Sequence, residues 1–314
     1  MSSASPAVRV LVTGADGFVG GRVVRRLAAN GHAVTAAIRR GTSPPPGAIA
    51  VRPFDLRDGA SVREVVEGGF EAVVHLAAVA SGADARRDPG AAWEINAAGT
   101  ARLCEALAES AAADSLFLLA STAEVYGSGV GSRPRMESDP PVPCSPYAAS
   151  KLGAEIAAAE VGRRTGLRII VARAFPHTGA GQDVRFVIPA FVQRIREAQG
   201  AGRRAVPVGN LEPVRDFLHV DDVVEAYIAL IERGMPGACY NVASGSGVSV
   251  GELFERIRAL LGADVQATED PALRRAADIS HLVGDATRLR EDTEWRPRRT
   301  LDEALDEVAS AQAH

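Results

Sequence analysis

Short apolar runs alternate with amphipathic stretches along the first half of the chain. Residues 8–13 are apolar and mostly β-branched, a glycine-rich turn follows, and residues 22–30 have a helical pattern that stops at Asn30-Gly31. Helical stretches separate four further apolar runs, which predict strands at residues 33–38, 72–76, 116–120 and 168–173. This alternation predicts an α/β fold with a parallel sheet.

The rhythm changes after Arg173. Residues 176–214 are richer in Gly and Pro, and two later helical patterns, at 221–233 and 249–261, surround one more apolar run at 238–242. We therefore expect a second, smaller region that covers the carboxyl edge of the sheet. The run at 238–242 is expected to return to the sheet as a strand.

Two predicted helices, at residues 91–113 and 146–164, are dense in Ala. Small side chains let helices approach one another closely, so a homodimer formed through these two helices is expected. A bias in composition would explain the Ala content equally well.

Composition is that of an ordinary soluble globular protein, with 314 residues, 46% of them apolar, and a net charge of −4. This charge gives no general basic surface for nucleic acid. No apolar run approaches the roughly 20 residues of a membrane-spanning helix, and residues 1–7 do not resemble a secretory signal. The three cysteines are far apart and lack a CxxC pattern, so we expect reduced thiols, no structural metal site and a cytoplasmic location.

The turn after the first strand contains Gly14, Gly17 and Gly20 in a GxxGxxG spacing. Glycines at such a turn permit a tight bend and a close approach of the backbone to a pyrophosphate, and the following helix N-terminus favours the anion. A plain turn is the alternative. The position directly after the first strand favours dinucleotide binding.

The second strand ends at Arg39-Arg40 and carries no carboxylate. An acidic residue here would select NAD, whereas arginine accommodates the 2′-phosphate of NADP. The sequence therefore favours NADP(H) over NAD(H), although two loop arginines could also be a solvated pair. Asp55, further along, is a candidate to accept a hydrogen bond from the adenine amino group.

Tyr147 and Lys151 have the i, i+4 spacing that places both side chains on one helix face. We expect the ammonium to lower the pKa of the phenol and so prepare it for acid/base catalysis. Thr122 follows a predicted strand 25 residues earlier and makes this combination more specific than YxxxK alone. Of the 35 basic residues 34 are arginine, and the single lysine stands at the position where this chemistry needs it.

These motifs resemble the extended short-chain dehydrogenase/reductase family, which includes nucleotide-sugar epimerases and dehydratases, over nearly the full chain. The resemblance implies a Rossmann-type doubly wound sheet, with residues 1–173 as the dinucleotide-binding domain and 174–314 mainly as the substrate-binding region. It also implies cofactor contacts beyond the glycines, at Asp16, Phe18, Val19, Leu56, Leu76, Ala77, Ala78, Asn96, Tyr147, Lys151 and His177.

Within that family, three stretches look most like GDP-4-dehydro-6-deoxy-mannose reductases: residues 173–182, 209–217 and 270–275, the last leading to Gly284-Asp285. The resemblance implies that Arg215 and Arg275 hold the phosphates or ribose of a nucleotide sugar. It places His177, Gln182 and Asn210 along the substrate groove, with Thr122 and Glu124.

Two positions depart from the reductase pattern, because Pro176 and Ala180 stand where Asn and Pro are usual. Proline lacks an N–H donor and fixes φ, so one polar contact to the substrate is missing. This departure affects the identity of the sugar or nucleotide more than the class of reaction.

The sequence thus predicts NADPH-dependent reduction of the C4 ketone of a nucleotide-linked 4-keto-6-deoxy sugar. Thr122, Tyr147 and Lys151 are the predicted catalytic residues. Glu124 keeps a 4,6-dehydratase open as an alternative, since a carboxylate there could abstract the C5 proton. A 4-epimerase and a non-catalytic NADP-binding redox sensor are the remaining alternatives.

Overall fold

The computed structural model describes residues 7–110, 113–128, 131–274 and 278–311. Its centre is a seven-stranded sheet in the order β11-β6-β5-β4-β1-β2-β3, in which every neighbouring pair is parallel. Its strands are β1 (Arg9–Thr13), β2 (Ala33–Ile38), β3 (Ala50–Pro53), β4 (Ala72–His75), β5 (Leu116–Thr122), β6 (Arg168–Ala174) and β11 (Cys239–Val242). The predicted α/β fold with a doubly wound parallel sheet is confirmed.

Alternate residues of each strand face opposite sides of the sheet, and both sides are covered by helices. On β1, Val10 and Val12 belong to the core shared with α1 (Gly20–Ala29), α8 (Val220–Arg233) and α10 (Thr287–Thr293). Leu11 belongs to the opposite core, which it shares with α2 (Gly59–Val66), α5 (Gly99–Ala108) and α6 (Pro146–Thr165). Strand order reverses between β1 and β4, and ligands of such sheets bind at the carboxyl ends beside this point.

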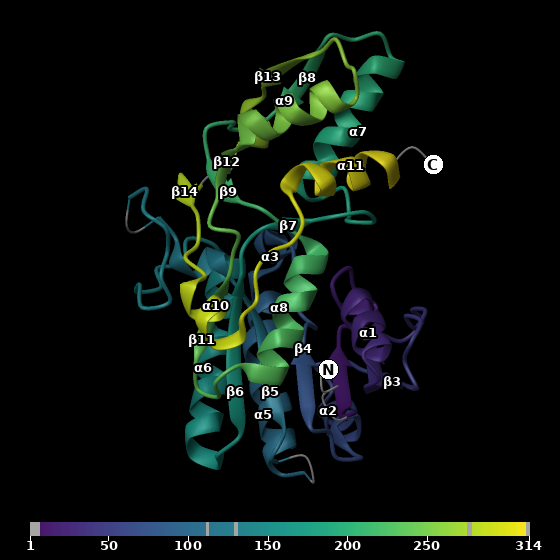
Figure 1. Ribbon diagram of the computed structural model, residues 1–314, viewed down its shortest axis with the longest axis vertical. Helices are drawn as coiled ribbons and strands as arrows, with labels where there is room; N and C mark the ends of the chain where they lie inside the picture. The colour runs from purple at the N-terminus through teal and green to yellow at the C-terminus, as the bar shows by residue number, and fades with distance from the viewer. Residues whose placement is uncertain (1–6, 111–112, 129–130, 275–277, 312–314) are drawn as a thin grey trace.

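A smaller group of elements, at the top of Figure 1, has a core of its own that includes Phe191, Phe254 and Val308. Its larger elements are α7 (Val187–Gly200), β8 (Ala205–Val208), α9 (Val250–Leu260), β13 (Gln266–Glu269) and α11 (Leu301–Ala311). Short strands connect it to the sheet domain: β7 (His177–Thr178) pairs with β10 (Leu218–His219), and β9 (Val214–Asp216) lies between β12 (Gly247–Ser249) and β14 (His281–Leu282).

The helix predicted over residues 91–113 is present but is shorter and not regular. It runs without interruption from α4 (Pro89–Trp93) through the π-helical turn η1 (Glu94–Ala98) to α5, which ends at Ala108, and the short helix α3 (Gly82–Arg87) precedes it. A π-turn adds one residue to the helical repeat and is frequent at functional sites. Here it carries the buried Asn96, whose contacts are given below.

Two short 3₁₀ turns complete the fold, η2 (Ala123–Tyr126) and η3 (Pro271–Leu273). Helix α7 lies within the Gly- and Pro-rich stretch for which the sequence predicted no helix, because the glycines and prolines lie mainly in its flanks. Among the described helices, none combines the length and the apolar character needed to cross a membrane.

Candidate active site

The glycine turn between β1 and α1 forms a cradle that side chains would block. Gly14 has a φ of +67°, and a Cβ at this position would lie 2.7 Å from the backbone nitrogen of Ala77. A Cβ on Gly20 would collide with the Gly14 carbonyl, and the Gly17 N–H donates to that carbonyl at 3.0 Å. The N-cap residue of α1 is Val19, so no side chain caps this helix. Cradle and helix end fit the pyrophosphate of a dinucleotide.

Arg39 and Arg40, the predicted selectors of a 2′-phosphate, directly follow β2 and are exposed. Arg39 Nε donates to Asp16 Oδ2 at 2.8 Å, and the Asp16 carboxylate is nearly buried within the glycine turn. Asp16 thereby holds the Arg39 guanidinium beside the cradle while most of that group faces solvent. A phosphate could bind this guanidinium without any rearrangement of Asp16.

Asp55 and Leu56 are used by the protein itself. The Asp55 carboxylate accepts hydrogen bonds from Arg57 Nε at 3.1 Å and Nη2 at 2.8 Å, and Arg57 lowers the pKa of Asp55. Leu56 is buried under α5, where a Cβ on Gly99 would lie 2.8 Å from the Leu56 Cβ. An adenine contact would therefore require Asp55 to share its carboxylate with Arg57, and Leu56 offers backbone atoms only.

A buried chain of hydrogen bonds fixes the loop that faces Gly14. Thr13 Oγ1 lies 2.7 Å from His75 Nδ1, and His75 Nε2 lies 3.1 Å from Thr100 Oγ1. Thr13 Oγ1 also accepts from the backbone N–H groups of Leu76 at 3.2 Å and Ala77 at 3.3 Å. Burial lowers the pKa of His75 to about 3, so its ring is neutral. The chain sets the position of the predicted cofactor loop, residues 76–78.

Asn96, on the π-turn, connects the loop after β4 to α6, the helix that carries the predicted catalytic residues Tyr147 and Lys151. Its Oδ1 accepts from the Val79 N–H at 2.8 Å, and its Nδ2 donates to the Val79 carbonyl at 3.1 Å and to Ser150 Oγ at 2.9 Å. Both Nδ2 protons are used within the protein, and Asn96 is 1% exposed. The geometry thus gives Asn96 a positioning role next to Lys151, whereas the resemblance implied a direct contact with the cofactor.

Thr122 ends β5, and Tyr147 and Lys151 lie in the first two turns of α6, whose N-terminus is capped by Ser145. Burial raises the pKa of the Tyr147 phenol, the Glu124 carboxylate raises it further, and a hydrogen bond with Thr122 opposes this rise. Burial lowers the pKa of Lys151 to about 8. The pKa of Tyr147 is therefore raised in the protein chain by itself, whereas the sequence analysis expected Lys151 to lower it; the groups that set the shift are the ones just named, and Lys151 is not among them.

Glu124 lies close to this phenol. It occupies η2, directly after β5, and its backbone N–H donates to Thr122 Oγ1 at 3.2 Å. Its side chain lines a small cleft whose other walls come from both regions of the chain: Cys144, Ser145, Pro176, Arg215, Asp278, Ile279 and Leu282. Glu124, which lies near Tyr147, and Arg215, the predicted phosphate ligand, therefore line the same cleft.

Arg215 forms a largely buried ion pair inside this cleft, with Nη2 2.7 Å from Asp278 Oδ1. The guanidinium also donates from Nη1 to the carbonyl of Val214 at 2.9 Å. A planar guanidinium at the wall of a cleft is suited to bind two phosphate oxygens at once. Pro176, the departure from the reductase pattern, lies in the same wall.

The other predicted groove residues make local contacts. His177 Nδ1 lies 3.0 Å from the Phe175 carbonyl, while Gln182 Oε1 accepts from Thr178 Oγ1 at 2.7 Å and Gln182 Nε2 donates to the His177 carbonyl at 2.9 Å. Asn210 Oδ1 accepts from the Glu212 N–H at 3.1 Å. None of the three lines the cleft described above. Arg275 lies outside the described residues.

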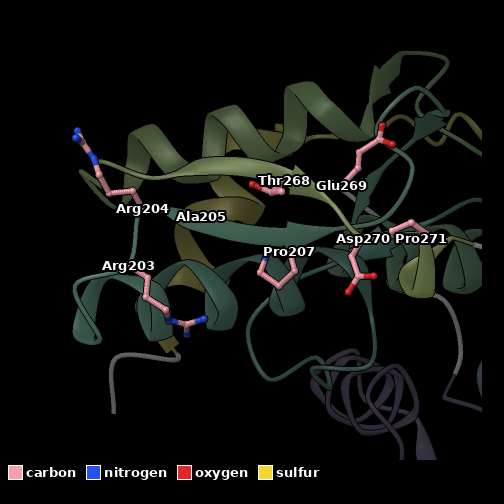
Figure 2. Close-up of a pocket in the computed structure, with 8 residues that line it drawn as sticks. All are labelled: Arg203, Arg204, Ala205, Pro207, Thr268, Glu269, Asp270 and Pro271. Carbon is pink, nitrogen blue, oxygen red and sulfur yellow. The ribbon is translucent and has the colours of Figure 1, made fainter.

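A more open hollow lies on the small β8–β13 sheet, far along the chain from the catalytic residues. Figure 2 shows that its charged side chains diverge: Arg204 and Glu269 point outward at opposite ends, and Arg203 and Asp270 point to other sides. Groups that do not converge on one point cannot orient a ligand, so we assign no function to this hollow.

Three polar residues behind Lys151 were not identified from the sequence as site residues. Glu155, Arg173 and Ser121 form a buried hydrogen-bonded cluster between α6, β6 and β5. One signal was present, because Glu155 stands four residues after the only lysine. Its partners could not be read from spacing, since they come from two other elements.

Comparison with known proteins agrees with this geometry. A family model described as the NAD dependent epimerase/dehydratase family matches residues 10–243. A GDP-6-deoxy-D-mannose reductase from Pseudomonas aeruginosa is 35% identical over 306 residues, which cover 96% of each chain. A UDP-glucose 4-epimerase from Streptomyces lividans is 33% identical over 314 residues, which cover 93% of this chain and 92% of the relative.

Among solved structures, that of RMD from Pseudomonas aeruginosa complexed with NADPH is similar to this chain. The two share 34% sequence identity and superpose with a TM-score of 0.83, over 97% of this chain and 98% of the other. Sequence and structure therefore agree over almost the whole length of the protein. The chain belongs to the NAD dependent epimerase/dehydratase family.

Proposed function

We propose that this protein uses NADPH to reduce the C4 ketone of a nucleotide-linked 4-keto-6-deoxy sugar of the GDP-4-dehydro-6-deoxy-mannose type. The observation that carries the proposal is the grouping of Thr122 and Glu124 around the Tyr147 phenol: Thr122 hydrogen-bonds the phenol and the Glu124 carboxylate lies close to it. Glu124 also lines the cleft that holds Arg215. The similarity to a GDP-6-deoxy-D-mannose reductase supports the choice of substrate class.

The residues of this chain perform the acid/base part of the reaction. When bound, NADPH supplies the hydride that adds to C4. Tyr147 is protonated at neutral pH, as an ordinary phenol is, so it can donate that proton to the C4 oxygen as the carbonyl is reduced. Burial and Glu124 raise its pKa and thus make the phenolate harder to form. Thr122 orients the phenol, and the ammonium of Lys151 stabilises the phenolate that remains until solvent returns a proton.

Arg39 and Arg40 support NADPH over NADH, since they directly follow β2, whose end carries no acidic residue, and the Arg39 guanidinium stays largely exposed while Asp16 pairs with its Nε. The similar RMD structure was solved with NADPH. We assign residues 1–173 to dinucleotide binding, because they contain the glycine cradle. Residues 174–314 are assigned mainly to substrate binding, because they contribute Arg215 and Asp278 to the cleft.

The test is turnover on a panel of GDP-, dTDP- and UDP-linked 4-keto-6-deoxy sugars. We expect NADPH oxidation in a one-to-one ratio with sugar reduced, with the GDP-linked substrate preferred. Tyr147→Phe should lower kcat at least 100-fold with little change in NADPH affinity, because general acid catalysis contributes roughly that much. Near-wild-type turnover by Tyr147→Phe would falsify the mechanism.

A 4,6-dehydratase or 4-epimerase is the second candidate, and one observation favours it. The Glu124 carboxylate lies in the cleft near Tyr147, where it could act as a base on the sugar. Both alternative reactions leave the total of reduced cofactor unchanged. Conversion of a 4-hydroxyl nucleotide sugar without net NADPH consumption would therefore select them over the reductase.

We further propose a homodimer formed through α4, α5 and α6. Trp93 of α4 and Ile156 of α6 are large apolar side chains that are 47% and 61% exposed, and Gly153 of α6 lies directly against the Trp93 ring. Trp93→Glu with Ile156→Glu should convert the dimer to a monomer in light scattering.

We also propose a cytoplasmic location, consistent with cysteines that are all unpaired.

A further inference from the structure

We propose that Glu155 and Arg173 are positioning residues for the reaction: Glu155, held rigid by Arg173 and Ser121, is the fixed counter-charge that places Lys151 and keeps it cationic beside Tyr147. This inference rests on the function proposed above. It concerns residues that touch neither substrate nor cofactor and that act only through Lys151.

The first observation is the arrangement along α6. Tyr147, Lys151 and Glu155 are spaced i, i+4 and i+8, so they form one stripe along the helix, with neighbouring Cβ atoms about 5–6 Å apart. Lys151 is 6% exposed and Glu155 is 7% exposed. Glu155 therefore lies one turn further along α6 than Lys151, on the same buried face.

The second observation is how firmly Glu155 is held. Arg173 Nη2 donates to Glu155 Oε2 at 2.7 Å and Arg173 Nε donates to Oε1 at 3.1 Å, which is a two-pronged contact. The Ser121 hydroxyl donates to the same Oε1. Ser121 and Arg173 are direct partners in the register of β5 and β6, so two adjacent strands hold one carboxylate.

Packing against Tyr126 also holds the Arg173 guanidinium in place. The guanidinium lies over the ring of Tyr126, 4.8 Å from the centroid, and the Tyr126 hydroxyl donates to Asn241 Oδ1 at 2.7 Å. Asn241 lies on β11, the neighbouring strand. The ion pair between α6 and β6 is thus held by contacts from three further elements, β5, η2 and β11, a rigidity that an exposed surface pair would lack.

The third observation is the charge around Lys151. His75 on β4 is neutral and Tyr147 keeps its proton, so at neutral pH neither group carries a charge that would repel or attract the Lys151 ammonium. Cys239, behind Arg173, is also neutral because burial raises its pKa to about 12. Glu155 is the anion that raises the pKa of Lys151 against the lowering by burial. Burial has the larger effect, and the Arg173 cation that pairs with the same carboxylate offsets part of the Glu155 charge, so Glu155 opposes the lowering without cancelling it.

A buried ion pair adds little net stability over an apolar pair of similar volume. Stability alone is thus a weak reason for this cluster at this place. Ser121 directly precedes Thr122, and Glu155 follows Lys151 by one turn, so the cluster fixes the strand end and the helix that carry the catalytic groups relative to each other.

The experiment uses the fact that Lys151 is the only lysine in the chain. Biosynthetic labelling with ¹³Cε-lysine gives a single side-chain signal, whose chemical shift against pH reports the Lys151 pKa directly. In the full-length Glu155→Gln variant we expect this titration to move down by roughly one pH unit or more, because an opposite charge at this range is removed. The alkaline limb of the kcat/KM profile should move down by the same amount.

Glu160→Gln is the matched control. Glu160 lies on the same helix and pairs with Arg164 at i, i+4, but on the exposed surface. It should leave both the lysine titration and the pH profile unchanged. A titration that stays at the wild-type position in Glu155→Gln overturns the proposal.

Glu155→Gln leaves Arg173 buried without its anion and could unfold the protein. The double variant Glu155→Gln with Arg173→Met removes both charges, and we expect it to fold and still to show the lowered lysine titration. A wild-type lysine titration in this folded double variant also overturns the proposal. Because the signal needs no turnover, failure of the proposed function would appear in the substrate panel and not in this titration.

Discussion

Replacing Lys151 with Met should stabilise the protein at neutral pH while it removes catalysis. The ammonium is 6% exposed, and burial lowers its pKa from the ordinary 10.5 to about 8. This difference corresponds to about 3 kcal/mol of free energy lost on folding with a charged lysine. Met has a similar length and no charge, and Glu155 keeps Arg173 and Ser121 as partners. Because the pKa of about 8 already includes the attraction to Glu155, we expect a gain of about 1–3 kcal/mol at pH 7.

The sign of the pH dependence follows from the lowered pKa. Below pH 8 the lysine is charged in both the folded and the unfolded state, so folding carries the full cost. As the pH rises through 8 toward 10.5, the folded state loses its proton before the unfolded state does, and the cost decreases. The advantage of Lys151→Met over the wild type should therefore fall to less than half of its neutral value by about pH 9.5.

The assay is urea unfolding of wild type, Lys151→Met and Lys151→Arg at pH 7 and pH 9.5, followed by circular dichroism. Lys151→Arg keeps the charge and so serves as the control, for which no stabilisation is expected. If Lys151→Met is less stable than the wild type at pH 7, or if its advantage grows with pH, the assignment of a costly buried ammonium is refuted.

Three further outcomes are expected. Gly14→Ala should weaken NADPH binding more than tenfold in a fluorescence titration, because Gly14 has a φ of +67° and a Cβ there would collide with Ala77. Gly31→Ala is the control: Gly31 has a φ of +88° and no neighbour within 4 Å, so this variant should lose roughly 1–2 kcal/mol of stability and keep its NADPH binding. Arg39→Ala should raise the KM for NADPH at least tenfold and leave that for NADH nearly unchanged, and an equal effect on both would contradict the 2′-phosphate assignment. A disulfide-exchange reagent at pH 8 should modify the exposed Cys144 quickly and the other two thiols slowly, since burial raises the pKa of both Cys104 and Cys239 to about 12; a fast phase that survives in Cys144→Ser would refute this order.

The central strands could be predicted from the sequence because burial on both faces makes them continuous apolar runs. Strands β1, β2, β4, β5 and β6 begin and end within two residues of the predicted positions. Strand β3 was missed because it lacks this burial on both faces. Ala50–Pro53 is a four-residue edge strand with mostly exposed side chains, so it has no apolar run to detect.

The π-turn at residues 94–98 could not be predicted from local pattern. The Ala-rich sequence favours a regular α-helix, whereas the Asn96 side chain on the π-turn bonds to Val79 and Ser150, which lie 17 and 54 residues away in the chain. The same limit applies to the cleft. The pairing of Arg215 with Asp278, 63 residues later, depends on how β9 and β14 come together.

The directions of the two pKa shifts bear on both directions of the chemistry. Burial and Glu124 keep the Tyr147 phenol protonated, whereas Lys151, with a pKa of about 8, is mostly charged at neutral pH. A reaction that begins by reducing a C4 ketone needs a phenol ready to donate a proton. A reaction that begins by oxidising a C4 hydroxyl, as an epimerase or a dehydratase must, needs the phenolate as a base. Burial and Glu124 therefore disfavour the phenolate in both directions: an oxidation needs it as the base, and a reduction leaves it after the proton has been donated. A positive charge beside the phenol is thus required for either reaction, and Lys151 is the residue that supplies it.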